Sequence, residues 1–313
     1  MMNIVFTVAI PVYNGEKRIT KVLEALKSQI PLVESTWEVI VIDNNSTDGT
    51  ADIVQDFRSA WPDNVPLRYF LESQQGIAFA RQRAIDESQG ELVGFLDDDN
   101  WPEPSWVQAA VNFAQSHPDA GAFGGRIHAS FDQEPPKNFG RIQSFFAIRD
   151  RGNISSLYRP QKLELPPGAG LVVRRQAWID VVPPKLQNQS RGGNDFEVLL
   201  YLHRAGWKIW YAPSLVIRHH INSERLEKKS VNLLIRKASL CVCNLRMINS
   251  SPLERPMLLI RLFLGGFKRA LRHMLYHRLE VIKDPMLFHE FTFYVYSSLS
   301  PLHWLFDKKV VKK

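Results

Sequence analysis

The hydrophobic positions in the first half of the chain alternate between two patterns. Continuous apolar runs are typical of strands buried on both faces of a parallel sheet, and four of them occur, at residues 4–11, 38–42, 67–71 and 92–96. Between the runs, apolar residues recur at helical spacing, as in Ile19, Val22, Leu23 and Leu26. Strands that alternate with helices predict an α/β fold with a doubly wound, mostly parallel central sheet.

The alternation weakens beyond Ala120. Residues 121–127 and 168–175 are predicted as further strands, and a helix is expected from about Asp195 to Gly206, with Phe196, Leu199, Leu200 and His203 on one face. In the strand-like run 215–221, the two-residue period places His219 on the same face as Leu215 and Ile217. We therefore predict that His219 points inward and that His220 points to the opposite face.

Charge divides the chain into two predicted domains. The formal net charge is +7, but residues 225–313 hold 17 Lys and Arg against 6 Asp and Glu, whereas residues 1–224 hold 22 against 26. We predict a catalytic or binding domain over 1–224 and a basic, mostly helical region over 225–313. The two cysteines are only two residues apart, too close to stabilise the fold through a disulfide, and no signal peptide is recognised before the first strand. The expected location is therefore the cytoplasm.

Three consecutive carboxylates, Asp97, Asp98 and Asp99, follow the fourth apolar run directly. Two charges about 4 Å apart repel by roughly 1 kcal/mol in water but by about 4 kcal/mol near a protein surface. A solvated turn or a bound cation would each relieve that repulsion. Asp43 ends the second run, and ligands of open α/β sheets bind outside the carboxyl ends of the strands. The acids are thus expected to converge on one crevice.

Six segments in order extend this picture: "VAIPVYNG", "VIVIDNNSTDGT", "GIAFARQRAI", "FLDDDNWPEPSW", "GAGLVVRR" and "GGNDFEVLLYLHRAGWKIWYAP". Over residues 3–222 the chain resembles an inverting family 2 glycosyltransferase with the GT-A fold. The resemblance implies transfer of a sugar from a nucleoside-diphosphate sugar to a hydroxyl of a saccharide or lipid-linked acceptor, in polysaccharide or glycoconjugate biosynthesis.

The resemblance also assigns roles to residues. It implies that Asp195 is the catalytic base, that Asp99 binds Mn²⁺ or Mg²⁺ at the donor diphosphate, and that His219 is a further metal ligand, with His220 as its alternative. A packed core histidine is the competing interpretation of His219, and a helix-dipole role that of Asp195. Donor-binding positions implied by the same segments are Pro11, Tyr13, Asn14, Asp43, Asn45, Gly76, Arg81, Asp97 and Asp98.

Two positions depart from the family pattern. Asn194 stands where Glu is commoner, which puts an acidic partner of the base in doubt, and Gln82 replaces the usual Asn after Arg81. Trp101 and Trp106 could stack on an acceptor sugar or belong to the core. Because glycine has no side chain, Gly168 and Gly170 could let the backbone approach the donor sugar closely, or they could simply form a turn.

Several alternatives stay open at this point. A nucleotidyltransferase would carry a Gly-rich basic loop after its first strand, which "PVYNGEK" matches poorly, and a non-catalytic sugar-binding module would need neither metal nor Asp195. An acidic crevice disfavours nucleic acid as a partner. The basic region, which has no apolar run of 18 residues, suits either the anionic inner face of a membrane or a helical subdomain packed on the catalytic core.

Overall fold

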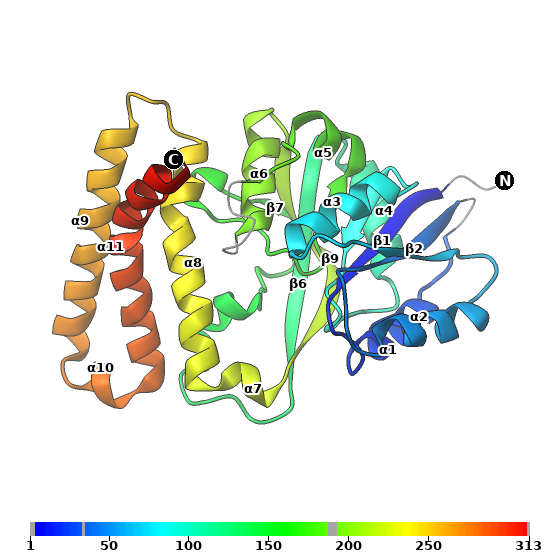
Figure 1. The fold of residues 1–313 in the computed structure, drawn as a ribbon, viewed down its shortest axis with the longest axis horizontal. Helices are drawn as coiled ribbons and strands as arrows, with labels where there is room; N and C mark the ends of the chain where they lie inside the picture. Colours follow the sequence, from blue (N-terminus) through cyan, green and yellow to red (C-terminus); the bar gives the residue numbers. More distant parts are fainter. Residues whose placement is uncertain (1–3, 33–34, 187–192, 312–313) are drawn as a thin grey trace.

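One mixed sheet forms the centre of the computed structural model, which describes residues 4–32, 35–186 and 193–311 (Figure 1). Nine strands of this described part belong to it. The first four strands along the sheet pair in parallel, in the order β3 (Leu67–Leu71), β2 (Thr36–Asp43), β1 (Ile4–Val12) and β4 (Leu92–Phe95). Their carboxyl ends therefore meet at one edge, as predicted from the apolar runs.

The other side of the sheet is mixed. β8 (Val172–Arg174) is antiparallel to β4 and to β6 (Ala120–Phe131), whereas β6 is parallel to β9 (Lys208–Ile221). β5 (Asn100–Pro102) and the short β7 (Ser156–Leu157) both pair with β9 in antiparallel fashion. Antiparallel β5 and β9 bring the end of the acidic turn directly beside the end of β9, with Asn100 opposite His219.

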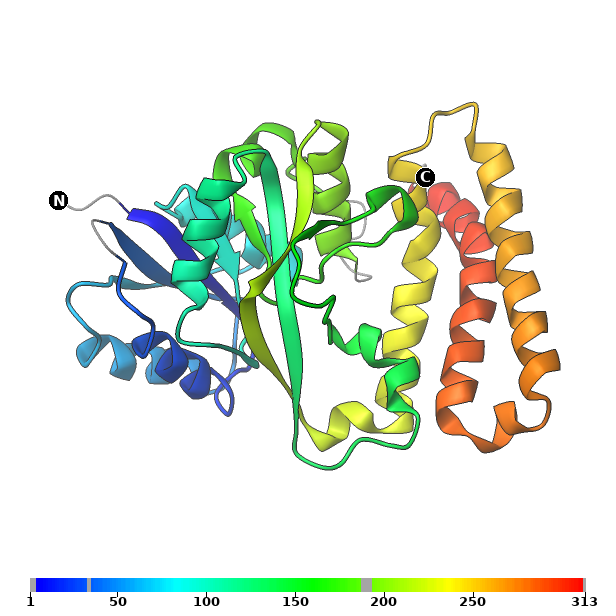
Figure 2. The same cartoon turned by 180° about the vertical axis from the view of Figure 1, so that it is seen from behind.

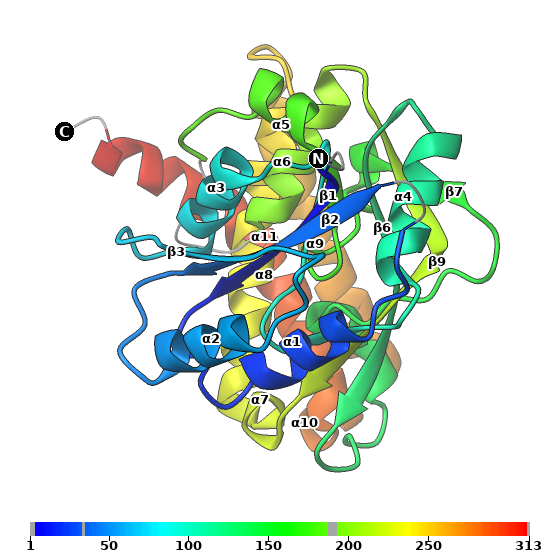
Figure 3. The same ribbon diagram turned by 90° about the vertical axis from the view of Figure 1, so that its right-hand side faces the viewer.

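Helices cover both faces of the sheet (Figure 3). On one face, α1 (Ile19–Lys27), α2 (Thr50–Ser59) and α4 (Trp106–Ser116) bury side chains against β1 and β2. On the other face, α3 (Ile77–Glu87), α5 (Arg175–Val181) and α6 (Asn194–Arg204) do the same. The predicted α/β class, with a doubly wound and mostly parallel central sheet, is confirmed.

β9 differs from its prediction in length. The expected strand began near Leu215, but β9 starts at Lys208 and continues through Pro213. Its pairing with β6 shifts register between Gly124 and Arg126, and this bulge accommodates the proline, which cannot donate a ladder hydrogen bond. Beyond the bulge the alternation is as predicted, because Leu215, Ile217 and His219 are buried while Arg218 is exposed.

The buried face of α6 was predicted incorrectly. Phe196 and His203 are only half-buried, whereas Asn194 and Glu197 are buried together with the leucines. α6 packs against the sheet on one side and against α8 on the other, so its buried arc is wider than a single helical stripe. Glu197, which lacks an apolar side chain, is enclosed by this double packing.

The residues after β9 are helical as predicted, in α7 (Ser223–Leu226), α8 (Lys228–Ile248), α9 (Arg255–His277), α10 (Glu280–Lys283) and α11 (Pro285–Val311). α11 packs between α8 and α9, and α9 lies farthest from the sheet (Figures 1 and 2).

Both cysteines are free and buried in α8. Among the described residues, no helix has both the length and the apolar character needed to span a bilayer. The boundary at residues 224 and 225 stays a prediction.

Candidate active site

The acidic turn lines one cavity of about 930 Å³, whereas Asp43, which was predicted to lie in the same crevice, is not among the residues that line it. Asp97, Asp98 and Asp99 occupy the turn between β4 and β5, and Asp195 lies in the first turn of α6. All four line the cavity, together with His219 from β9 and with Pro11 and Tyr13 at the end of β1. The sheet edge thus joins segments that are about 100 residues apart in the sequence.

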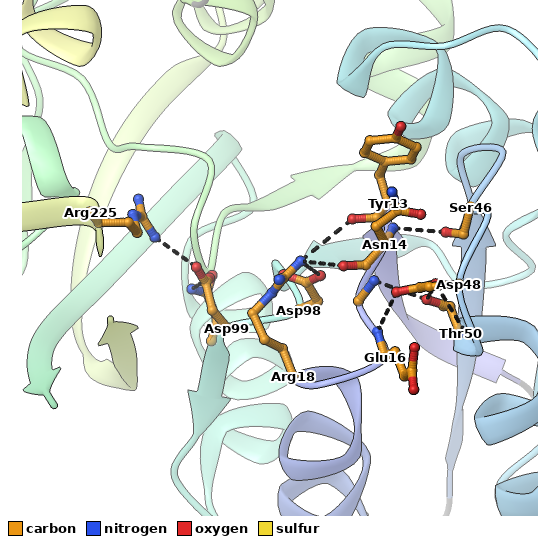
Figure 4. Close-up of polar contacts among 12 residues, drawn as sticks. Tyr13, Asn14, Glu16, Arg18, Ser46, Asp48, Thr50, Asp98, Asp99 and Arg225 are labelled. Carbon is orange, nitrogen blue, oxygen red and sulfur yellow. Dashed lines mark hydrogen bonds and ion pairs between the residues drawn. The ribbon is translucent and has the colours of Figure 1, made fainter. Parts of the chain in front are cut away.

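Each carboxylate of the acidic turn has an arginine beside it. Arg18 Nη2 lies 2.6 Å from Asp98 Oδ2, and Arg225 Nη1 lies 2.7 Å from Asp99 Oδ2 (Figure 4). Arg81 Nη2 lies 3.5 Å from Asp97 Oδ1. Arg18 immediately precedes α1, Arg225 belongs to α7 and Arg81 belongs to α3. The positive charge that the crowded carboxylates require is therefore partly supplied by the protein itself.

Asp98 is the most strongly perturbed of the three acids. Its burial raises the pKa of the carboxyl to about 6, although the hydrogen bonds and charge of Arg18 act in the opposite direction. Arg18 donates from both Nε and Nη2 to this carboxylate and also reaches the backbone oxygen of Asn14 at 3.1 Å. Asp98 thus connects the acidic turn to the loop after β1, and Arg18 contacts both of its carboxylate oxygens.

Asp99, His219 and Arg225 form a compact group. Asp99 Oδ2 lies 3.4 Å from His219 Nε2, and Arg225 Nη1 lies 2.9 Å from the same nitrogen. His219 Nδ1 is 2.8 Å from the backbone oxygen of Phe146, which can only accept, so the proton belongs on Nδ1. Nε2 then carries the lone pair, which accepts the hydrogen bond from Arg225 Nη1, and this is the tautomer in which Nε2 can bind a metal.

The carboxyl of Asp99 has a lowered pKa. Burial acts to raise it, but the contact with His219 and the charges of Arg225 and Arg18 outweigh burial. Asp99 also accepts a hydrogen bond of 2.9 Å from Asn100 Nδ2. The side chain is therefore held as a carboxylate that points at its cationic neighbours.

Asp195 is ion-paired with Arg81, whose guanidinium contacts Asp195 Oδ1. Burial lowers the pKa of Arg81, while the charge of Asp97 opposes that shift. Gly168 lies against this pair, because a Cβ atom added there would collide with both Arg81 Nη2 and Asp195 Oδ2. The predicted base, Asp195, thus lies between the buried guanidinium of Arg81 and the backbone of Gly168.

The predicted donor residues Asn14 and Asn45 lie in the loops that follow β1 and β2, at the same edge of the sheet. Asn14 and Asn45 both have left-handed backbones, with φ of +48° and +64°. The backbone N–H of Asn14 donates to Ser46 Oγ (Figure 4). The backbone N–H of Thr47 donates to Asn14 Oδ1. These contacts join the two loops into one rim.

Asp43 is buried beneath that rim and is not among the cavity-lining residues. Its carboxylate accepts hydrogen bonds from Tyr69 Oη at 2.7 Å and from the Ser46 N–H at 2.8 Å. Gly76, at φ +139°, donates its N–H to Asn44 Oδ1. The donor-binding roles of Asp43, Asn45 and Gly76 stay predictions.

The structure distinguishes His219 from His220 as a candidate metal ligand, and it places Trp106 in the core. His220 stacks on Trp101 with ring centroids 5.1 Å apart, and its Nε2 faces Asp132 rather than the cavity. Trp106 is fully buried against Phe6, so it belongs to the core. The geometry favours His219 over His220 as a metal ligand.

Within the described ranges, no group of three or more His, Cys, Asp or Glu side chains is arranged to hold a metal ion. Asp99 and His219 form a pair of suitable donors, and the Arg225 guanidinium lies against both. A divalent ion could be held by this pair once Arg225 moves aside. Arg18 and Arg225 could not be predicted as site residues, because neither belongs to a motif and Arg225 is one of the many cations of the basic region.

A scan against protein-family models matches residues 7–177 to the model described as glycosyl transferase family 2. The chain belongs to this family. Glycosyltransferase AglE of Haloferax volcanii is 30% identical over 217 residues, which are 68% of this chain and 66% of AglE. Putative glycosyltransferase EpsH of Bacillus subtilis is 26% identical over 50% of the chain and 47% of its own length. This chain thus spans less than two thirds of each of these relatives.

Solved structures share the fold of this family member. Mannosyltransferase PcManGT from Pyrobaculum calidifontis, in complex with GDP-Man and Mn²⁺, has a TM-score of 0.65 at 18% identity and covers 95% of this chain and 86% of its own. TarS 1-349 of Staphylococcus aureus, in complex with UDP-GlcNAc, has a TM-score of 0.52 at 15% identity, with 95% and 91% covered. At these identities the similarity establishes the GT-A fold alone.

Proposed function

We propose that this family 2 member is an inverting, metal-dependent glycosyltransferase that moves a sugar from a nucleoside-diphosphate sugar to an acceptor hydroxyl. The observation that carries the proposal is the position of Asp195, which lines the same cavity as the acidic turn and is paired with buried Arg81. A non-catalytic sugar-binding module would not require the carboxylate of Asp195 to be paired with a buried arginine in this cavity.

Asp195 is the general base in this proposal. It takes the proton from the acceptor hydroxyl as the oxygen attacks the anomeric carbon from the side opposite the diphosphate, which inverts that centre. Arg81 fixes the orientation of the carboxylate and bridges it to Asp97. Asn194, which precedes the base, is buried and carries no charge, so Arg81 rather than a second carboxylate controls the base.

Asp99 and His219 would hold the Mn²⁺ or Mg²⁺ ion, which when bound acts as a Lewis acid on the departing diphosphate. The oxygen of Asp99 and the nitrogen of His219 are donors that favour Mn²⁺. The structures of two neighbours, PcManGT and GalNAc-T7, are complexes with Mn²⁺, which agrees with this choice. The donor itself would lie along the rim formed by Pro11, Tyr13, Asn14, Asn45 and Gly76.

The acceptor would enter from the other end of the cavity, which the C-terminal helices form. Apolar Leu234 and Phe293 line this end together with the cations Arg246 and Arg269. Neither arginine has an ion-pair partner in the described part of the chain, and the charge of Arg269 adds to burial in lowering the pKa of Arg246. This lining supports an acceptor with both apolar and anionic parts, such as a lipid-linked saccharide.

A donor screen tests the proposal. Nucleoside-diphosphate release is followed for a panel of UDP-, GDP- and dTDP-sugars with Mn²⁺, first in wild type and then in Asp195→Asn. We expect the substitution to lower kcat by about 10²- to 10⁴-fold, since it removes the base and keeps the shape. Asp119→Asn, which breaks a surface ion pair with Lys208, is the control and should keep full activity. Equal turnover in wild type and Asp195→Asn would refute the assignment.

A further inference from the structure

The face of α9 that points away from the rest of the protein is apolar over most of the helix. α9 lies at the outer end of the molecule (Figure 2), and its opposite face is buried, with Gly266 against Ser298 of α11. At 3.6 residues per turn, the outward apolar side chains fall within an arc of about 120°. The stripe consists of Met257, Ile260, Phe263, Leu264, Phe267, Leu271, Met274 and Leu275, which are between 40% and 65% exposed. A contiguous surface of this kind marks an interaction site.

The flank of this stripe is basic. Arg261, Lys268 and Arg272 are exposed on an adjoining arc of α9, and in the described part of the chain none of the three forms an ion pair. From Arg255 to His277 the helix contains five Lys and Arg residues and no Asp or Glu. Positive charge beside the apolar stripe is therefore not compensated within the helix.

We propose that this face of α9 docks onto an anionic lipid bilayer. An amphipathic helix with Phe and Leu on one side and Lys and Arg beside them lies in the plane of the membrane interface. A second copy of the chain is the less favoured occupant, because a symmetric pair across α9 would bring Arg and Lys of one copy against those of the other. Anionic headgroups neutralise the same cations, and the acyl region receives Phe263, Phe267 and Leu271.

Docking in this way gives the acceptor a route to the site. Arg269 belongs to α9 and lines the cavity, so the helical wall of the cavity would lie close to the membrane surface. This consequence, which rests on the proposed function, favours a lipid-linked acceptor over a free saccharide. Binding of the bilayer itself depends only on α9 and is tested without any sugar donor.

The test is co-sedimentation of the full chain with vesicles. We expect binding to vesicles of phosphatidylcholine mixed with phosphatidylglycerol, much weaker binding to pure phosphatidylcholine, and release by salt. Phe263→Ser/Phe267→Ser/Leu271→Ser should weaken binding by about tenfold or more, since three large apolar groups are lost. The control, Ile30→Ser/Ile154→Ser/Leu157→Ser, changes three exposed apolar residues elsewhere and should bind as wild type.

A second pair of variants tests the charge. Arg261→Gln/Lys268→Gln/Arg272→Gln should reduce binding to the anionic vesicles by roughly fivefold for each cation removed. Lys17→Gln/Arg58→Gln/Lys185→Gln removes the same charge from other surfaces and should have little effect. Thermal unfolding of every variant verifies that each is folded.

Three results would overturn the proposal. The first is absence of binding by folded wild-type protein, and the second is equal binding by the α9 variants and their controls. The third is a wild-type dimer in sedimentation velocity that the Phe263, Phe267 and Leu271 substitutions turn into a monomer, because the face would then belong to a second copy. Donor hydrolysis without vesicles distinguishes failure of this inference from failure of the proposed function.

Discussion

The Nη1 atom of Arg225 lies 2.7 Å from Asp99 Oδ2 and 2.9 Å from His219 Nε2, so one guanidinium contacts both predicted metal ligands. A divalent ion and this cation cannot occupy the same position. Binding of the ion therefore requires that charge-assisted hydrogen bonds to Arg225 are broken, and each such bond contributes about 1.5–3 kcal/mol.

Arg225→Ala should therefore tighten Mn²⁺ binding, by about ten- to a hundredfold, because no ion pair has to be broken first. Titration of Mn²⁺ followed by electron paramagnetic resonance measures the free ion. Arg159→Ala is the control and should bind Mn²⁺ as wild type does, since Arg159 is ion-paired with Glu164 at 2.7 Å and is not among the residues that line the cavity. Weaker Mn²⁺ binding in Arg225→Ala would show that Arg225 assists the ion rather than competing with it.

Gly168→Ala should lower turnover by about a hundredfold. The new methyl group would collide with Arg81 Nη2 and Asp195 Oδ2, and a displacement of a catalytic group by about 1 Å costs about that much in rate. The stability loss from overpacking should be about 1–3 kcal/mol, measured by urea unfolding. Gly140→Ala, where a Cβ meets nothing within 4 Å, serves as the control and should be fully active. Normal kinetics in Gly168→Ala would mean that the pair tolerates displacement.

Tyr69→Phe should lower the free energy of unfolding by about 1–3 kcal/mol, because it removes one of the two donors to the buried carboxylate of Asp43. Tyr294→Phe removes a hydrogen bond of similar length, 2.8 Å, to the less buried Glu290 and should cost less than about 1 kcal/mol. Chemical denaturation of both variants gives the comparison. If the two losses are equal, burial of Asp43 does not govern the stability of this contact.

The thiols of α8 should react slowly at neutral pH. Burial raises the pKa of Cys241 to about 11 and that of Cys243 to about 12, above the ordinary value of 9.0. A raised pKa means that the folded state favours the protonated thiol, so this contribution to stability is present below pH 9 and is lost as the pH rises through 11 and 12. At pH 8 the thiolate fraction of Cys241 is about a hundredfold below that of an ordinary thiol.

Iodoacetamide labelling followed by mass spectrometry measures this reactivity. Native protein at pH 8 should label at least about a hundredfold more slowly than protein unfolded in urea, and labelling should accelerate steeply above pH 9. Cys241→Ala assigns the remaining signal to Cys243. Rapid native labelling at pH 8 would contradict the burial of these thiols.

Local sequence patterns predicted the alternation of strands and helices, the inward direction of His219 and the common edge at which the strands before Asp43 and Asp97 end. Each of these follows from short-range periodicity, from side-chain parity along a strand, or from the rule that parallel strands end at a common edge. The segments that carry the family resemblance are also continuous in the sequence, so they could be found without a structure.

The positions of the cations beside the acids depend on tertiary packing. Arg18 is 80 residues from Asp98, and Arg225 is 126 residues from Asp99, so no local pattern connects either pair. The same holds for the contact of Gly168 with Arg81 and Asp195, for the bulge that lengthens β9, and for the outward turn of the apolar face of α9. These features depend on how whole elements pack against one another, and packing is set by the sum of many long-range contacts rather than by neighbours along the chain.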